Sequence, residues 1–123
     1  MKKNLITVIA ALLLFAFLPS CSLLNQSTLN PPSWIIGSWS DDYDIFTWEF
    51  AEDNVLYHSS IEMDYKALAL NPDVEITEEV GDDAYSFTYK TETTSTDYSF
   101  EFVDDTTINY SIDNSIPVVL HKD

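Results

Sequence analysis

The chain has 123 residues, with 21 acidic side chains, five lysines and no arginine, for a formal net charge of −16. Such a surface repels nucleic acid and lacks a basic stripe, so nucleic-acid binding is excluded. The sequence also contains three Trp, seven Tyr and seven Phe. This aromatic content can build a core, so the acidity is that of a folded surface and not of a disordered tail.

The N-terminus has the pattern of a secretory signal. Lys2 and Lys3 precede an apolar run over 5–18, and a small residue, Ser20, stands before Cys21. As a helix the run would cover only ~21 Å, short of the ~30 Å core of a bilayer, so a cleaved signal is favoured over a permanent span. We therefore expect residues 1–20 to be a signal peptide.

The segment Leu18-Pro19-Ser20-Cys21 resembles the lipobox of bacterial lipoproteins. The resemblance implies cleavage after Ser20 and lipidation of Cys21, and more than one acyl chain is enough for stable membrane anchoring. Because Cys21 is the only cysteine, lipidation also accounts for an otherwise lone thiol. Ser22 is not an aspartate, and by resemblance to Gram-negative sorting rules this favours the periplasmic face of the outer membrane.

The expected mature chain starts at Cys21 and carries three lysines against 21 acidic residues, a formal charge of −18. Residues 21–33 are polar, end near Pro31-Pro32 and show no periodicity, which is typical of a tether. Residues 34–123 are enough for one modest domain. We interpret the acidity chiefly as a source of solubility, with a basic partner as the functional alternative.

From residue 34 onward, apolar and polar residues alternate with a period of two, as in 46–50, 55–60, 85–90, 98–103, 108–112 and 118–121. Turn-forming Asn, Asp, Ser and Gly separate these runs. The pattern predicts an all-β domain: an antiparallel up-and-down meander closing into a small barrel of about eight strands. Residues 61–70 fit either a strand or a short helix that ends at Asn71-Pro72.

Gly37-x-Trp39 at the head of this meander resembles the first motif of the lipocalins. With the lipobox, the tether and the closing Leu120-His121-Lys122, the chain looks like the small lipocalin-like lipoproteins of bacteria. The resemblance implies a barrel that Trp39 closes at one end. That family packs an arginine over the tryptophan; this chain has none, so Lys122 is the candidate cation on the ring.

No catalytic, metal or cofactor motif is specific enough to nominate. His58 and His121 fall on the polar faces of their strands, which is typical of surface histidines. Clusters such as Asp82-Asp83 lack the spacing of a calcium loop and fit turn chemistry. No nucleophile elbow accompanies the serines, so we expect no enzyme activity.

The expected inner face is rich in aromatic residues: Trp39, Phe46, Trp48, Phe50, Tyr57, Tyr85, Phe87, Tyr89, Tyr98, Phe100, Phe102 and Tyr110. We expect these side chains to fill most of the barrel. Where room remains, the candidate ligand-binding residues are Trp48, Tyr57, Tyr89, Tyr98 and Tyr110. The leading hypothesis is a membrane-anchored, non-catalytic binding domain for a small apolar ligand. The alternative is an acidic interaction protein with a filled barrel that docks on a basic protein. A cavity of about 300 Å³ or more would favour the first, and an exposed apolar patch of several hundred Å² the second.

Overall fold

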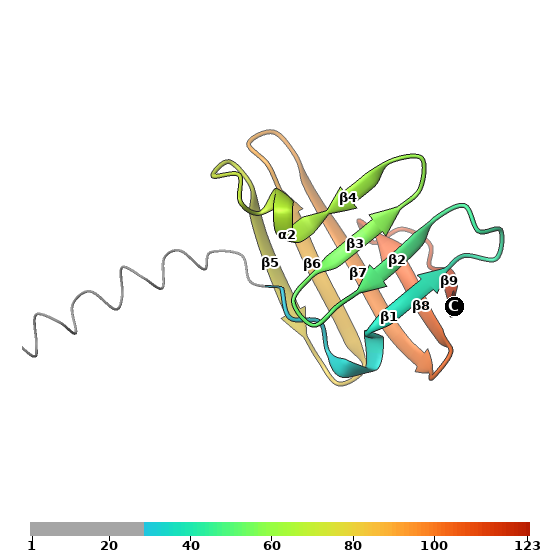
Figure 1. Cartoon of the computed structure of the whole chain (residues 1–123). Coiled ribbons are helices and arrows are strands. Elements are labelled where there is room, and N and C mark those ends of the chain that lie inside the picture. The colour runs from blue at the N-terminus through green and yellow to red at the C-terminus, as the bar shows by residue number, and fades with distance from the viewer. Residues whose placement is uncertain (1–28) are drawn as a thin grey trace, which may run out of the picture.

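The computed structural model describes residues 29–123. The expected signal peptide and the lipidation site at Cys21 lie outside the described residues. Figure 1 shows two groups of strands that cross face to face, with β1–β4 in front of β6 and β7. Aromatic side chains from both groups meet in the space between them.

The described chain forms one nine-stranded sheet in which every neighbouring pair is antiparallel, in the order β4-β3-β2-β1-β9-β8-β7-β6-β5. The elements are η1 (Ser33–Ile35), β1 (Gly37–Ser40), β2 (Thr47–Phe50), β3 (Val55–His58), β4 (Glu62–Asp64), α2 (Tyr65–Leu68), β5 (Glu75–Val80), β6 (Ala84–Lys90), β7 (Ser95–Asp104), β8 (Thr107–Ile112) and β9 (Val118–Lys122). The predicted all-β antiparallel meander is confirmed. There are nine strands where about eight were expected. The strands β4 and β5 are the two edges of the sheet and do not pair with each other, so the sheet is a curled half-barrel.

The period-two pattern explains which side of each strand is buried. Trp48 on β2 is directly opposite Trp39 on β1 and Tyr57 on β3, so the three form one row on the inner face. Across the half-barrel, Phe100 on β7 is directly opposite Tyr85 on β6 and Tyr110 on β8, and Phe100 is fully buried. Outward neighbours such as Glu49, Ser86 and Glu101 are polar because that face meets water.

Residues 61–70 contain both of the structures that their sequence allowed. The short edge strand β4 runs directly into α2, and Asp64 caps the helix by accepting a hydrogen bond from Ala67 N at 3.1 Å. The same carboxylate accepts from Asn54 Nδ2 at 2.9 Å, which ties the helix start to the β2–β3 turn. The helix then brings Tyr65, only 1% exposed, into the aromatic core.

The last residues of the expected tether pack against the sheet. Leu29 is 2% exposed, and Asn30 N donates to both carboxylate oxygens of Glu78 at 2.9 and 3.0 Å. Further on, Ile35 is fully buried, and Trp34 Nε1 donates to Gly81 O at 3.0 Å. Residues 29–36 therefore cover one end of the half-barrel (Figure 1), and the folded unit starts earlier than the pattern at residue 34 indicated.

The Gly37-x-Trp39 segment brings a lysine onto a tryptophan. Trp39 is fully buried, its Nε1 donates to Ile35 O at 2.8 Å, and Lys122 Nζ lies 5.6 Å from the ring centroid. Gly37 has φ +129°, and a Cβ there would lie 3.0 Å from Lys122 Cε. A glycine is thus required both by the backbone and by the close passage of the lysine. The expected cation over Trp39 is confirmed.

Candidate functional site

The two ends of the half-barrel differ. Residues 29–36 cover the end that carries the β5–β6 turn, which we call the closed end. The loops after β1, β3 and β8 lie at the opposite end, which we call the open end, because neighbouring strands are antiparallel. Here a cavity of about 190 Å³ reaches into the aromatic core. It is the tyrosine pocket, lined by Trp48, Tyr57, Ile61, Met63, Tyr65, Tyr98, Tyr110 and Ile112.

The structure brings most of the expected ligand-binding residues together. Trp48, Tyr57, Tyr98 and Tyr110 all line the tyrosine pocket. Tyr89 does not line it; its ring packs edge-on against Tyr65, with centroids 5.6 Å apart.

Four lining residues were missed by sequence reasoning: Ile61, Met63, Tyr65 and Ile112. The first three lie within residues 61–70, where the sequence fitted both a strand and a helix. The sequence therefore did not predict which of these side chains point inward. The alternation over 108–112 predicted a strand whose last inward residue is Ile112. An apolar residue at the end of such a strand is the sequence feature that could have indicated the rim of a pocket.

Trp48 forms the floor of the pocket. Its ring centroid lies 4.8 Å from that of Tyr57, 5.2 Å from Tyr98 and 5.5 Å from Tyr110, with planes inclined by 57–66°. These rings are tilted or edge-on to the indole, the arrangement that aromatic quadrupoles prefer over a face-to-face sandwich. The pocket is therefore walled by rings in several orientations.

The indole nitrogen of Trp48 is unsatisfied. Trp48 is 1% exposed, yet its Nε1 is the one buried side-chain polar atom of residues 29–123 without a hydrogen-bond partner. The indole is close enough to the Tyr110 hydroxyl to counteract part of the rise in that tyrosine's pKa, but the two form no hydrogen bond of regular geometry. A buried donor without a well-formed hydrogen bond costs roughly 1–3 kcal/mol, so Trp48 Nε1 would gain from an acceptor in better geometry than the Tyr110 hydroxyl offers.

The hydroxyls of Tyr65, Tyr98 and Tyr110 stay neutral. Burial raises the pKa of Tyr65 far above its usual range, and its Oη donates to Tyr98 Oη at 3.3 Å. Burial is also the largest cause of the raised pKa values of Tyr98 and Tyr110, and the negative charge of Asp113 adds to both. The pocket thus offers neutral hydroxyls and ring surfaces, with a carboxylate nearby.

Two larger hollows lie over β5, β6 and β7, with volumes of about 330 and 320 Å³. The first is lined mainly by polar groups, including Thr77, Thr88 and Asp97. The second follows the turn at Gly81 and is shaped largely by backbone and outward side chains. Neither combines a buried lining with an unpaired polar group, so the tyrosine pocket is the better candidate despite its smaller volume.

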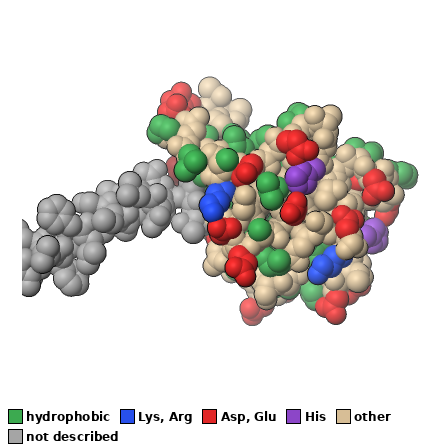
Figure 2. Space-filling view, in the orientation of Figure 1, with side chains coloured by type: hydrophobic (Ala, Val, Ile, Leu, Met, Phe, Trp, Pro, Cys, Tyr) green, Lys and Arg blue, Asp and Glu red, His purple; other side chains and the backbone are tan. Residues whose placement is uncertain are grey.

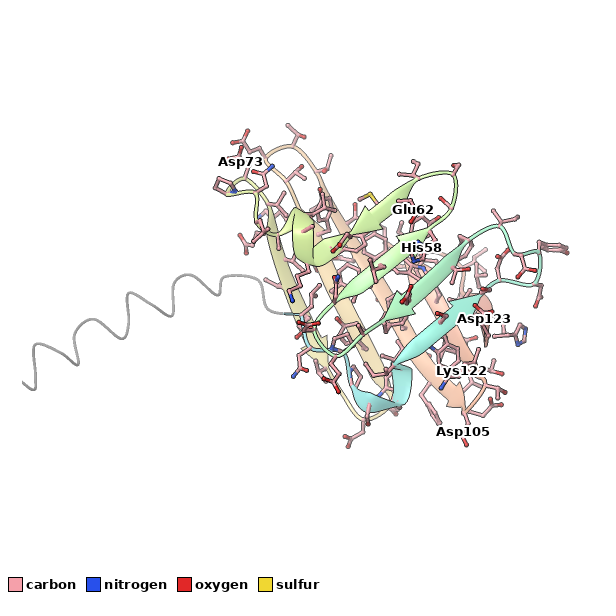
Figure 3. All side chains as sticks on the ribbon, in the orientation of Figure 1. His58, Glu62, Asp73, Asp105, Lys122 and Asp123 are labelled. Carbon is pink, nitrogen blue, oxygen red and sulfur yellow. The ribbon has the colours of Figure 1, made fainter. Side chains whose placement is uncertain are left out.

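The histidines lie on the outer surface, as their positions in the strands predicted. His58 on β3 is held between Glu62 on β4 and Glu49 on β2, with 3.0 Å between Nε2 and Glu49 Oε1 (Figure 3). Hydrogen bonds to Glu62 and then Glu49 raise the pKa of His58. His121 Nε2 lies 2.8 Å from Asp42 Oδ1. Within residues 29–123, no three His, Cys, Asp or Glu side chains converge to hold a metal ion.

The surface in Figure 2 carries acidic side chains spread among neutral ones, with few lysines. In the described part of the chain, no helix is both long and apolar enough to cross a membrane. Comparisons of the chain with protein-family models, with curated proteins and with solved structures gave no significant match. The geometry of the tyrosine pocket is therefore the main structural guide to function.

Proposed function

We propose that this protein is a lipoprotein of the bacterial cell envelope, anchored through Cys21, whose lipocalin-like domain binds a small ligand without catalysis. The single observation that carries the binding function is the tyrosine pocket. It is a concave, largely apolar ring surface that also carries tyrosine side chains with hydroxyls, which is the combination of a largely apolar site with a few placed polar groups that ligand sites use.

The size of the pocket limits the ligand. At about 190 Å³ it falls short of the ~300 Å³ that we expected of a ligand cavity, so it has room only for a ligand smaller than a drug-sized one. Trp48, Phe87 and Phe100 pack against one another below it and are at most 1% exposed, so within residues 29–123 no channel for a long acyl chain continues inward. The fitting ligand is compact and has a largely apolar body.

A second candidate is a protein partner that docks on the open end. Large apolar side chains are exposed in its loops: Tyr43 is 83% exposed, Ile45 67% and Ile116 88%. Together with Ile61 and Ile112 on the pocket rim, they offer apolar contact beside an acidic surface. This observation keeps a basic protein partner as the alternative occupant of the same end.

Native mass spectrometry on the chain, purified gently from the cells that make it, tests ligand binding. We expect an additional mass that is lost on denaturation. Ile112→Trp places a larger ring on the pocket rim and should abolish the additional mass. Val119→Trp is the matched control, since Val119 is similarly exposed (42% against 39%) but points outward from β9. A bare polypeptide mass, or equal retention in both variants, would contradict a ligand in this pocket.

Fractionation tests the anchor separately. We expect the wild-type chain in the membrane fraction, labelled by radioactive fatty acid, and the Cys21→Ala variant unlabelled and released. A wild-type chain that carries no fatty acid would overturn the anchoring part of the proposal and leave the binding part standing.

A further inference from the structure

The tyrosine pocket is lined only by neutral side chains. Four tyrosines and a tryptophan form most of its wall, and two isoleucines and a methionine complete it. No lysine, histidine or carboxylate is among the lining residues. The faces of aromatic rings carry partial negative charge, so a wall of this kind attracts a cation as well as apolar groups. The lining alone is thus compatible with two ligand classes, neutral and cationic.

The charge near the pocket distinguishes between these classes. Asp113 directly follows the lining residue Ile112, and its carboxylate is hydrogen-bonded to the backbone of Asp97, the residue before the lining Tyr98. Its negative charge also raises the pKa values of Tyr98 and Tyr110. Its carboxylate is fixed, because Oδ1 accepts a hydrogen bond from Asp97 N at 2.8 Å and its own backbone has φ 49°. A fixed negative charge beside two lining residues favours a cation in the pocket and disfavours an anion.

The lysines of residues 29–123 offer no counter-charge in the lining. Lys122 lies over Trp39, and Lys66 pairs with Asp53 with 2.5 Å between Nζ and Oδ2. Lys90 is paired in register with Glu75 on the edge strand. The whole chain carries a formal charge of −16, and a field of this sign concentrates cations at the surface.

We propose that the tyrosine pocket binds a compact organic cation, an alkylated ammonium group, through the rings of Trp48 and its tyrosine neighbours. This inference rests on the proposed binding function and names its ligand class. The methyl groups of such a cation match the apolar lining, its charge is spread and weakly hydrated, and the ring faces replace part of the lost hydration.

Isothermal titration of the full chain, in a detergent without a choline headgroup, tests the proposal with a matched pair of probes. Choline is compared with its uncharged carbon analogue, in which a quaternary carbon replaces the nitrogen, so shape is kept and charge is removed. We expect choline to bind on the order of tenfold more tightly, the factor that cation–π contact at a partly desolvated site provides. Choline binding should also weaken at high salt because the surrounding charge is screened.

Two variants locate the site. Asp113→Asn keeps an oxygen acceptor for Asp97 N and a side chain that tolerates positive φ. It should weaken the binding of choline about threefold and leave the binding of the carbon analogue unchanged. Asp82→Asn makes the same charge change in the β5–β6 turn at the closed end and should leave both affinities unchanged. Tyr57→Phe should keep choline binding because it keeps the ring, whereas Tyr57→Leu should lose it; thermal melts check that both variants fold.

The outcomes separate this inference from the proposed function. Equal binding of choline and its carbon analogue, lost together in Ile112→Trp, would overturn the cation and leave a neutral ligand in the pocket. Absence of binding by both probes would overturn the inference as well, while the native mass measurement would still decide whether the pocket holds a ligand. Equal effects of Asp113→Asn and Asp82→Asn would contradict the placement of the cation at the open end.

Discussion

The closed and open ends of the half-barrel treat their buried polar groups differently. At the closed end, Trp39 Nε1 donates to Ile35 O and Trp34 Nε1 donates to Gly81 O. At the open end, Trp48 is as deeply buried as Trp39, but its Nε1 has no partner in the described chain. Burial alone therefore does not distinguish these two tryptophans, whereas hydrogen-bond satisfaction does.

The same contrast holds for apolar side chains. Leu29 and Ile35 at the closed end are at most 2% exposed, and Ile61 and Ile116 at the open end are 63% and 88% exposed. Apolar groups exposed in loops contribute little to folding and are available for contact. The buried side chains of the closed end contribute to the stability of the fold, and the open end is the surface on which we expect binding.

The largest expected effect tests whether residues 29–36 belong to the folded unit. Leu29→Ala removes a buried side chain and should lower the free energy of unfolding by about 2–3 kcal/mol. Leu70→Ala is the matched control, because Leu70 is 84% exposed, and should change it by less than about 0.5 kcal/mol. Urea denaturation measures both variants. Similar small losses would mean that residue 29 does not contribute to the closed end.

A smaller effect is expected from Gly37 at the same end. Gly37→Ala adds a Cβ to a residue with φ +129° and brings that atom close to Lys122 Cε. The substitution should lower the free energy of unfolding by about 1–2 kcal/mol. Adding Lys122→Ala removes the neighbouring side chain and should restore only part of the loss, since the backbone strain remains. Denaturation of the single and double variants measures this. Complete restoration would show that the close approach, and not the backbone, requires the glycine.

The third prediction compares the two tryptophans directly. Trp39→Phe removes a donor that Ile35 O uses, whereas Trp48→Phe removes a donor that is unpaired. Because both lose similar ring area, Trp39→Phe should be the more destabilising by about 1 kcal/mol, the usual net value of a buried hydrogen bond. Thermal or urea unfolding without added ligand measures the difference. A larger loss from Trp48→Phe would mean that its nitrogen has a partner in solution.

Much of the fold could be predicted from the sequence because alternation defines which side of a strand is buried. Trp39, Trp48 and Phe100 were expected on the inner face and are at most 1% exposed. Phe102 is on the inner face as well, opposite the buried Ile108 and edge-on to Trp34, but it is near the end of β7 and 37% exposed; the pairing of β7 shifts directly after it, between Phe102 and Asp104. Period-two reasoning holds only while the register is regular.

Other features depend on long-range contacts that a local pattern does not contain. The strand β5 was not expected, since its inner row includes Glu78, a residue typical of the outer face. In the structure Tyr85 Oη donates to this carboxylate at 2.8 Å, and Asn30 N donates as well. Asn30 and Glu78 are 48 positions apart, so their hydrogen bond leaves no local pattern in the sequence. Residues 29–33 therefore resembled a tether. For the tyrosine pocket, alternation identified the ring-bearing strands but not Tyr65, which a helix supplies.

The smallest predicted effect concerns the outer wall of the open end, where His58 lies between Glu62 and Glu49. The carboxylates raise the pKa of His58, so the protonated form is bound more tightly in the folded chain. The resulting stability is fully present below the unfolded pKa of ~6.5 and is lost as pH rises through the higher folded value. The pair is about a third or more exposed, so the contribution should stay below about 1 kcal/mol. Urea denaturation of wild type and His58→Gln from acidic to alkaline pH should show the variant less stable at low pH, with the difference vanishing at high pH. A difference that grows with pH would mean that His58 stabilises the wall as a neutral ring.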